Sequence, residues 1–462
     1  MSLIPSMGVL FRAAWVVFSF SVASILFPWK GSAETLQEAL AAAYSNNPDL
    51  LAARATLRSV DELVPQALSN WRPTLDYSAS AGKSAMMTKP RQDSYNLDPW
   101  SQGLALSQPL YRGGQTVADT QKAKSLVRAE RYSLLTAEQQ VLLDAATAYI
   151  EVLRDEAVLK LKRNNETFLQ KQQSITAQQF ELGQKTKTDV SQAKARLSRS
   201  IAGRIRARAD LRSSKATYLK VIGMDPGDLT EPTPLTQMPP TLEEALKIAL
   251  NENPEILAAR YDEEAARHNV RKIIGELLPT VSLSGELSRT RQTSNPDART
   301  DSAEIGVELT LPLYQSGSVS SRVREARQTV SQKREKTNST LRNVKEETTS
   351  AWEDLVAARV QITSFQDEIE ASKVALEGVR IEASVGFRTI LDILDAEQEF
   401  LDANVSFVTA KSDEFIAGLK LLKAIGWLTA NRMELAGKLY DPEVHYQNVR
   451  DKWWGLGLTP EE

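Results

Sequence analysis

The sequence predicts a mixed α and β fold made of two copies of one unit, in which pairs of amphipathic strands alternate with long helical hairpins. Three observations predict it. Motifs recur 203 or 206 positions apart along the chain. Alternating apolar and polar residues follow a proline in each copy, and the stretches 114–183 and 317–386 contain no proline.

Composition excludes several classes of protein. The 462 residues are 25% charged and 42% apolar, which is too polar for a polytopic helical membrane protein, and a net charge of −3 does not favour nucleic acid as a partner. Cysteine is absent and only two histidines occur, so disulfides, thiolate sites and histidine-based metal or acid–base sites are not expected. We therefore expect no enzyme activity, no cofactor and no metal.

The N-terminus indicates export. An apolar run, 13–27, follows Arg12 and precedes the small residues 31–33. This pattern is typical of a secretory signal peptide at 1–33, whereas a membrane anchor would need roughly 20 apolar residues to span a bilayer. No later stretch is apolar enough to span as a helix, so the mature protein is expected to be exported without a helical anchor.

An internal duplication organises the rest. The hexapeptide 35–40 (TLQEAL) recurs as 241–246 (TLEEAL), 206 positions later, and Pro-Leu-Tyr at 109–111 recurs at 312–314, 203 positions later. Chance does not produce such a register. The predicted organisation is a first repeat at 34–223, a proline-rich linker at 224–240, a second repeat at 241–428 and a C-terminal tail at 429–462.

Each repeat is predicted to open with a helix, interrupted near Asn47-Pro48 in the first, and to continue with a β-hairpin. The hairpins are expected at about 74–110 and about 280–313, where apolar residues such as Val281 and Leu283 alternate with serine and glutamate. Two half-buried hairpins on a soluble core would explain this alternation. A transmembrane barrel with its apolar face towards lipid would explain it too, and export without a helical anchor favours the barrel.

Long helical hairpins follow, at about 113–222 and about 316–425, with Gly183 and Gly386 as the residues that end the first helix of each. A helix that ran through 114–183 would be about 100 Å long. Four strands per chain cannot close a membrane barrel, whereas three chains would give twelve strands and a lumen that the helices would extend.

The chain resembles the TolC family of outer-membrane efflux proteins. The resemblance rests on the repeat, on the predicted strand–helix joints at Pro109 and Pro312, and on the run 385–396 (VGFRTILDILDA). It implies a homotrimer with a twelve-stranded β-barrel in outer-membrane lipid and a helical tunnel through the periplasm. It also implies an exit duct for drug efflux, type I protein secretion or both. Its implied partners are a periplasmic adaptor and an inner-membrane pump of the ABC or RND type.

The same resemblance implies roles for individual residues. Asp392 and Asp395, three apart on one helix face, would form a carboxylate ring at the periplasmic entrance that favours cations and raises some of its own pKa values. Asp189 and Arg388 would form a latch that holds this end shut, although Ala383 replaces a tyrosine that often helps the latch. The alternatives are that Asp392 and Asp395 lie on an ordinary solvated helix face, and that Asp189 and Arg388 form an ordinary surface ion pair.

The resemblance also places adaptor docking near Gly183 and Gly386. A structural periplasmic coiled coil, or an adaptor without a pore, is the rival interpretation; it explains the long helices but not the amphipathic strands. No Walker-type glycine loop occurs, which favours a passive duct, and the absence of cysteine excludes N-terminal lipidation. The absence of cysteine favours a duct that works with both protein-secretion systems and drug pumps. The sequence does not identify the exported substrate.

Overall fold

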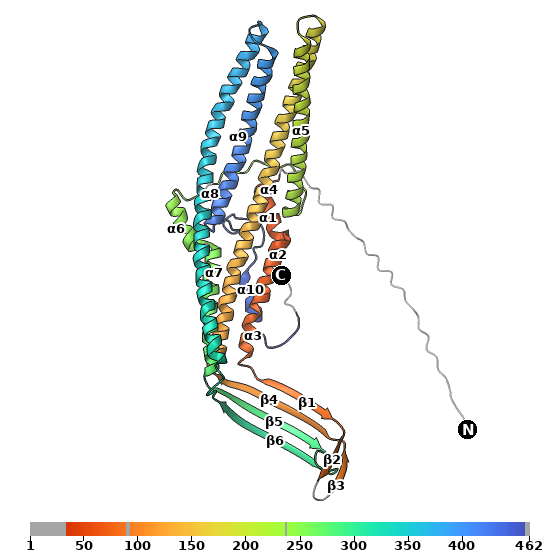
Figure 1. Ribbon diagram of the computed structural model, residues 1–462, viewed down its shortest axis with the longest axis vertical. Coiled ribbons are helices and arrows are strands. Elements are labelled where there is room, and N and C mark those ends of the chain that lie inside the picture. The colour runs from red at the N-terminus through yellow and green to blue at the C-terminus, as the bar shows by residue number, and fades with distance from the viewer. Residues whose placement is uncertain (1–33, 89–92, 236–237, 458–462) are drawn as a thin grey trace, which may run out of the picture.

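The computed structural model describes residues 34–88, 93–235 and 238–457. The predicted signal peptide, 1–33, lies outside these residues. The chain is elongated, with a β-sheet at one end and the turns of two helical hairpins at the other (Figure 1). None of the helices in the described ranges is long and apolar enough to cross a membrane.

The first half begins with three short helices and continues through four strands to two long helices. These elements are α1 (Leu36–Asn46), α2 (Pro48–Asp61), α3 (Leu63–Ser69), β1 (Thr74–Ala81), β2 (Ser84–Thr88), β3 (Asp93–Leu97), β4 (Trp100–Arg112), α4 (Gln115–Glu181) and α5 (Lys187–Ile222).

The second half repeats this order with two strands instead of four. Its elements, followed by one helix of the tail, are α6 (Leu242–Glu252), α7 (Pro254–Ile274), the 3₁₀ turn Gly275–Leu277, β5 (Thr280–Arg291), β6 (Arg299–Thr310), α8 (Ser318–Ser384), α9 (Ile390–Ala424) and α10 (Pro442–Val449).

Two antiparallel sheets form. The larger has the strand order β1-β4-β5-β6, so the hairpins of both halves lie side by side, and β2 pairs with β3 in a small separate sheet. This small sheet was not predicted, because the sequence between the two arms of the first hairpin does not alternate. The larger sheet supplies the four strands per chain that the sequence predicts.

The duplicated Asn-Pro pair has a clear structural reason. Asn47 caps α2 by accepting hydrogen bonds from the backbone N–H groups of Asp49 and Leu50, and its amide donates to the Val221 carbonyl oxygen at 2.9 Å. Asn253 caps α7 in the same way and donates to the Ala424 carbonyl oxygen at 2.9 Å. Proline at the first position of a helix loses no hydrogen bond there. Each Asn-Pro therefore ties the start of one helix to the end of its long hairpin.

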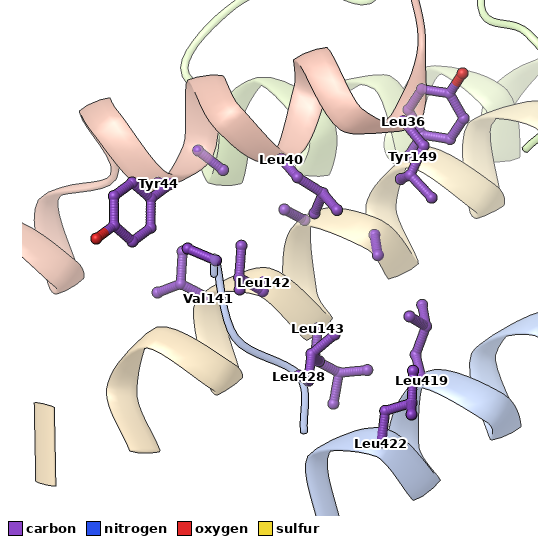
Figure 2. Packing of buried hydrophobic residues seen from close by; sticks show 14 of the residues in the cluster. Leu36, Leu40, Tyr44, Val141, Leu142, Leu143, Tyr149, Leu419, Leu422 and Leu428 are labelled. Carbon is purple, nitrogen blue, oxygen red and sulfur yellow. The ribbon is translucent and has the colours of Figure 1, made fainter. Parts of the chain in front are cut away.

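The main hydrophobic core lies midway along the molecule and joins both halves. Figure 2 shows Leu40 of α1 facing Leu142 of α4, with Leu419 of α9 and Leu428 of the following loop on the other side. All four side chains are fully buried. From this core, α4 and α8, each of 67 residues and thus about 100 Å long, run to both ends of the molecule. The mixed fold predicted from the duplication is confirmed.

Candidate functional site

The register of the larger sheet separates its residues into two faces. Tyr77 lies opposite Leu104, Leu104 opposite Leu287, and Leu287 opposite Ala303. Directly opposed residues of antiparallel strands point to the same side. One face therefore carries a band of apolar side chains across all four strands, and it also includes Leu75, Leu106, Val281, Leu283, Ile305, Val307 and Leu309.

This apolar face is uncovered within the chain. Tyr77 is 68% exposed, Ile305 79% and Val307 67%. A contiguous exposed apolar surface of this kind marks a lipid or protein contact. The alternative of half-buried hairpins on a soluble core is therefore wrong, because within the described residues no core covers the sheet.

The opposite face is polar and acidic. Asp76, Glu286 and Glu304 lie in one row across the sheet, joined through Ala105, and Glu308 lies on the same face four residues further along β6. Glu286 and Glu304 are directly opposed, and like charges in that position are destabilising unless water screens them. This face, with Asp76, Glu286 and Glu308, is therefore suited to an aqueous lumen, as the transmembrane-barrel interpretation of the alternation requires.

The two strand–helix joints differ in detail. Pro109 lies inside β4, at a β-bulge where the pairing with β5 shifts, because proline cannot donate to the ladder. The first joint is made by Gly113 and Gly114. A Cβ on Gly113, whose φ is +57°, would lie 2.2 Å from the Gly275 carbonyl oxygen, so only glycine fits. Pro312 lies between β6 and α8, in the second joint.

Gly183 and Gly386 form the two tips of the helical end. Gly183 has a φ of +74° and Gly386 of +90°. After each glycine a backbone N–H reaches back to the helix, from Gln184 to the Gln179 oxygen at 2.8 Å and from Phe387 to the Glu382 oxygen at 2.9 Å. This is the Schellman arrangement, which ends a helix sharply. Both glycines therefore reverse the chain at an exposed turn.

Asp189 and Asp392 occupy equivalent positions just after these turns, and each closes a capping box. The Thr389 backbone N–H donates to the Asp392 carboxylate at 2.8 Å, and the Asp392 N–H donates to the Thr389 hydroxyl at 3.3 Å. Thr186 and Asp189 repeat the arrangement. The hydrogen bonds from these threonines hold the pKa of Asp189 and of Asp392 below the ordinary range. The Thr-x-x-Asp spacing in the sequence is a capping signal that could have revealed this role.

The predicted latch residues are not joined within one chain. Arg388 donates to Glu382 at 2.8 Å, and that carboxylate raises the pKa of Arg388. Asp189 is engaged by Thr186. In the described part of the chain, Asp189 and Arg388 share no hydrogen bond or ion pair. A latch between them therefore requires a neighbouring chain.

Asp395 has a partner that the sequence did not reveal. Arg196 of α5 forms an ion pair with the Asp395 carboxylate of α9 and so joins the two helical hairpins. Beside it, Leu169 of α4 packs with Ile390 and Leu394 of α9 in a small buried cluster. The structure thus gives the two predicted ring residues different contacts: Asp392 caps its own helix, whereas Asp395 links the two hairpins.

Comparison with known proteins gives a consistent result. Residues 39–224 and 245–427 match the family described as outer membrane efflux protein, in two segments that correspond to the two halves. The chain is 35% identical over 431 residues to the outer membrane efflux protein BepC of Brucella suis, covering 93% of both chains. It is 28% identical to the outer membrane protein TolC of Vibrio cholerae, covering 86% of this chain and 92% of TolC.

Among solved structures, the fold resembles the CmeC outer membrane channel of Campylobacter jejuni, with a TM-score of 0.77. That match has 17% identity and covers 97% of this chain and 98% of CmeC. The four-stranded sheet and the two long helical hairpins are therefore a fold that this chain shares with CmeC.

Proposed function

The chain belongs to the outer membrane efflux protein family, and we propose that it is a passive duct, without catalytic activity of its own, through which partner proteins drive export. Its place is the outer membrane, and its function is that of an exit duct for efflux or secretion. The observation that carries the proposal is the two-faced sheet: one face has an exposed apolar band, the opposite face is acidic, and the strands continue into long helices.

The working form that we propose is a homotrimer. The sheet has free edges at β1 and β6, and unpaired backbone groups in lipid cost several kcal/mol each. Pairing β6 of one chain with β1 of the next satisfies these groups, and three copies give twelve strands, enough for a water-filled lumen. Three copies of the paired hairpins would continue this lumen into the periplasm.

We place the closed entrance at the helical tips. Asp392 and Asp395 would line it, with Arg196 compensating part of the charge of Asp395. The raised pKa values predicted for this ring depend on carboxylates from three chains lying together. Asp189 of one hairpin and Arg388 of a neighbouring chain would form the latch, after Arg388 exchanges Glu382 for Asp189.

The partners in this proposal are a periplasmic adaptor and an inner-membrane pump of the ABC or RND type. The adaptor would dock around Gly183 and Gly386, where Leu182 and Phe387 are 73% and 84% exposed. One relative is named as an outer membrane efflux protein, and another, AprF of Pseudomonas aeruginosa, as an alkaline protease secretion protein; these names support a duct for efflux, protein secretion or both.

Loss of export in cells tests this proposal. A strain that lacks the chain should become more sensitive to exported drugs, retain a secreted protein, or both, and the wild-type gene should restore export. Two matched variants refine this test. Val307→Arg, on the apolar face, should fail to restore export, whereas Glu308→Lys, on the polar face, should restore it. Unchanged export in the deletion strain would contradict the proposal.

A further inference from the structure

The C-terminal tail, for which the sequence indicates no role, folds back along the first half of the chain. Tyr446 of α10 packs against a small apolar cluster that α3 and α4 build, and Val449 is 1% exposed. The cluster consists of Val64, Ala67, Ala123 and Val127. Figure 1 shows α10 beside α2 and α3; the chain turns below α10 and then runs back up beside α2. The tail is therefore a packed part of the fold.

Polar contacts fix the position of α10. The His445 ring nitrogen Nδ1 lies 3.0 Å from the carboxylate of Asp61, which is completely buried in α2. Arg131 of α4 forms an ion pair with Glu443, and its guanidinium lies over the Tyr446 ring. These contacts hold the tail along the helices that lead to the sheet.

Contacts with Arg72 fix the position of Trp453 along the molecule. The Arg72 guanidinium donates to the Lys452 carbonyl oxygen at 2.7 Å and lies 4.9 Å from the centre of the Trp453 ring. Arg72 immediately precedes the Pro73 that leads into β1, which begins at Thr74, and Leu75 is the first apolar residue of the lipid-facing band on that strand. Trp453 is thereby held where the helical part of the molecule meets the sheet.

From this placement we propose that Trp453, Trp454 and Leu456, here called the C-terminal aromatic segment, insert into the periplasmic interface of the outer membrane beside the barrel. Trp453 is 69% exposed, Trp454 is 90% exposed, and Leu456 is fully exposed. Tryptophan favours the membrane–water boundary, where its ring is buried and its N–H stays hydrated. Arg72 holds Trp453 close to the residues that lead into β1, next to the periplasmic end of its apolar band, so the occupant that we propose is lipid.

The inference rests on the outer-membrane placement of the sheet and not on the proposed trimer contacts, partners or gate. Water, or the surface of a neighbouring chain, could face the segment instead. Each of these gives a different result when the surroundings of the segment are probed directly.

The absence of cysteine allows a clean test, because a single introduced cysteine can carry a fluorescent label. We would label Leu456→Cys in the otherwise native full chain and reconstitute it in phosphatidylcholine vesicles that contain nitroxide lipids, with the nitroxide at the headgroup or deep in the acyl chain. Ile305→Cys, on the apolar face, is the deep-lipid control. Phe387→Cys, at the far helical tip, is the aqueous control.

The label at 456 should be quenched at least twofold more strongly by headgroup nitroxides than by deep ones, with the reverse at 305 and no lipid quenching at 387. Adding Trp453→Ser/Trp454→Ser should reduce lipid quenching at 456 to the level at 387. Two results would overturn the inference: iodide quenching at 456 equal to that at 387, which means water, or protection from both quenchers, which means a protein contact. Failure of the control at 305 would instead refute the membrane placement of the sheet.

Discussion

Replacing Arg196 with alanine is expected to loosen the closed tip, because Arg196 and Asp395 form an ion pair between the two hairpins of each chain. The Arg196 side chain is 27% exposed and that of Asp395 50%, so water screens the pair. Pairs of this kind contribute about 0.2–1 kcal/mol each. Three copies in a trimer would sum to roughly 0.6–3 kcal/mol, which corresponds to a roughly 3-fold to 150-fold rise in the ratio of open to closed tips.

Open probability in planar bilayers measures this shift. Arg206→Ala is the matched control, because among the described residues Arg206 forms its ion pair with Asp210 of the same helix and none with a second element. The exchange Arg196→Asp/Asp395→Arg should restore closure. Cation selectivity distinguishes the role of Asp395 in the ion pair from its role in the entrance ring. Arg196→Ala leaves the Asp395 carboxylate uncompensated and should raise cation selectivity, whereas Asp395→Ala should lower it. An open probability of Arg196→Ala equal to that of Arg206→Ala would refute the reasoning.

Three further predictions concern the sheet, the joint and the core. Val307→Arg puts a charge on the lipid face at a cost of about 2–4 kcal/mol and should abolish the heat-resistant trimer on gels, whereas Glu308→Lys should leave it intact. Gly113→Ala should lower the melting temperature by several degrees, since its Cβ would meet the Gly275 oxygen, and an unchanged value would count against the joint as described. Burial raises the pKa of Glu138, so ionised Glu138 costs stability above its folded pKa and the cost disappears as the pH falls through that pKa. Glu138→Gln should therefore unfold at a higher temperature than the wild type at pH 8, and the difference should shrink as the pH falls through the raised folded pKa and vanish below about pH 4, where the unfolded carboxyl also binds its proton; a constant difference would contradict this assignment.

Local patterns made much of the fold predictable. The alternation that begins at Val281 identifies a two-faced strand, and the proline-free stretches identify helices, because both patterns depend on residues close in sequence. The repeat then places β1, β4, β5 and β6 in matched positions. The lipid-facing band could be predicted for the same reason, since one residue in two must point outward.

Contacts between distant elements could not be predicted. Whether Arg196 meets Asp395 depends on the rotation of two helices after about 100 Å of α4 and α8, and a small change in twist would part them. The position of the tail depends likewise on the buried Asp61 and its partner His445, which are 384 residues apart. By contrast, the capping roles of Asp189 and Asp392 were visible in the sequence as Thr-x-x-Asp.

The most direct test of the central claim, an outer-membrane duct closed at its helical tips, is single-channel recording of the purified protein in planar bilayers. The wild type should give a small, cation-selective conductance. Asp392→Ala/Asp395→Ala should increase that conductance or remove its selectivity, and Arg388→Ala should raise the open probability. A protein that stays soluble and never inserts, or an inserted trimer that passes no current even as Arg388→Ala, would contradict the account.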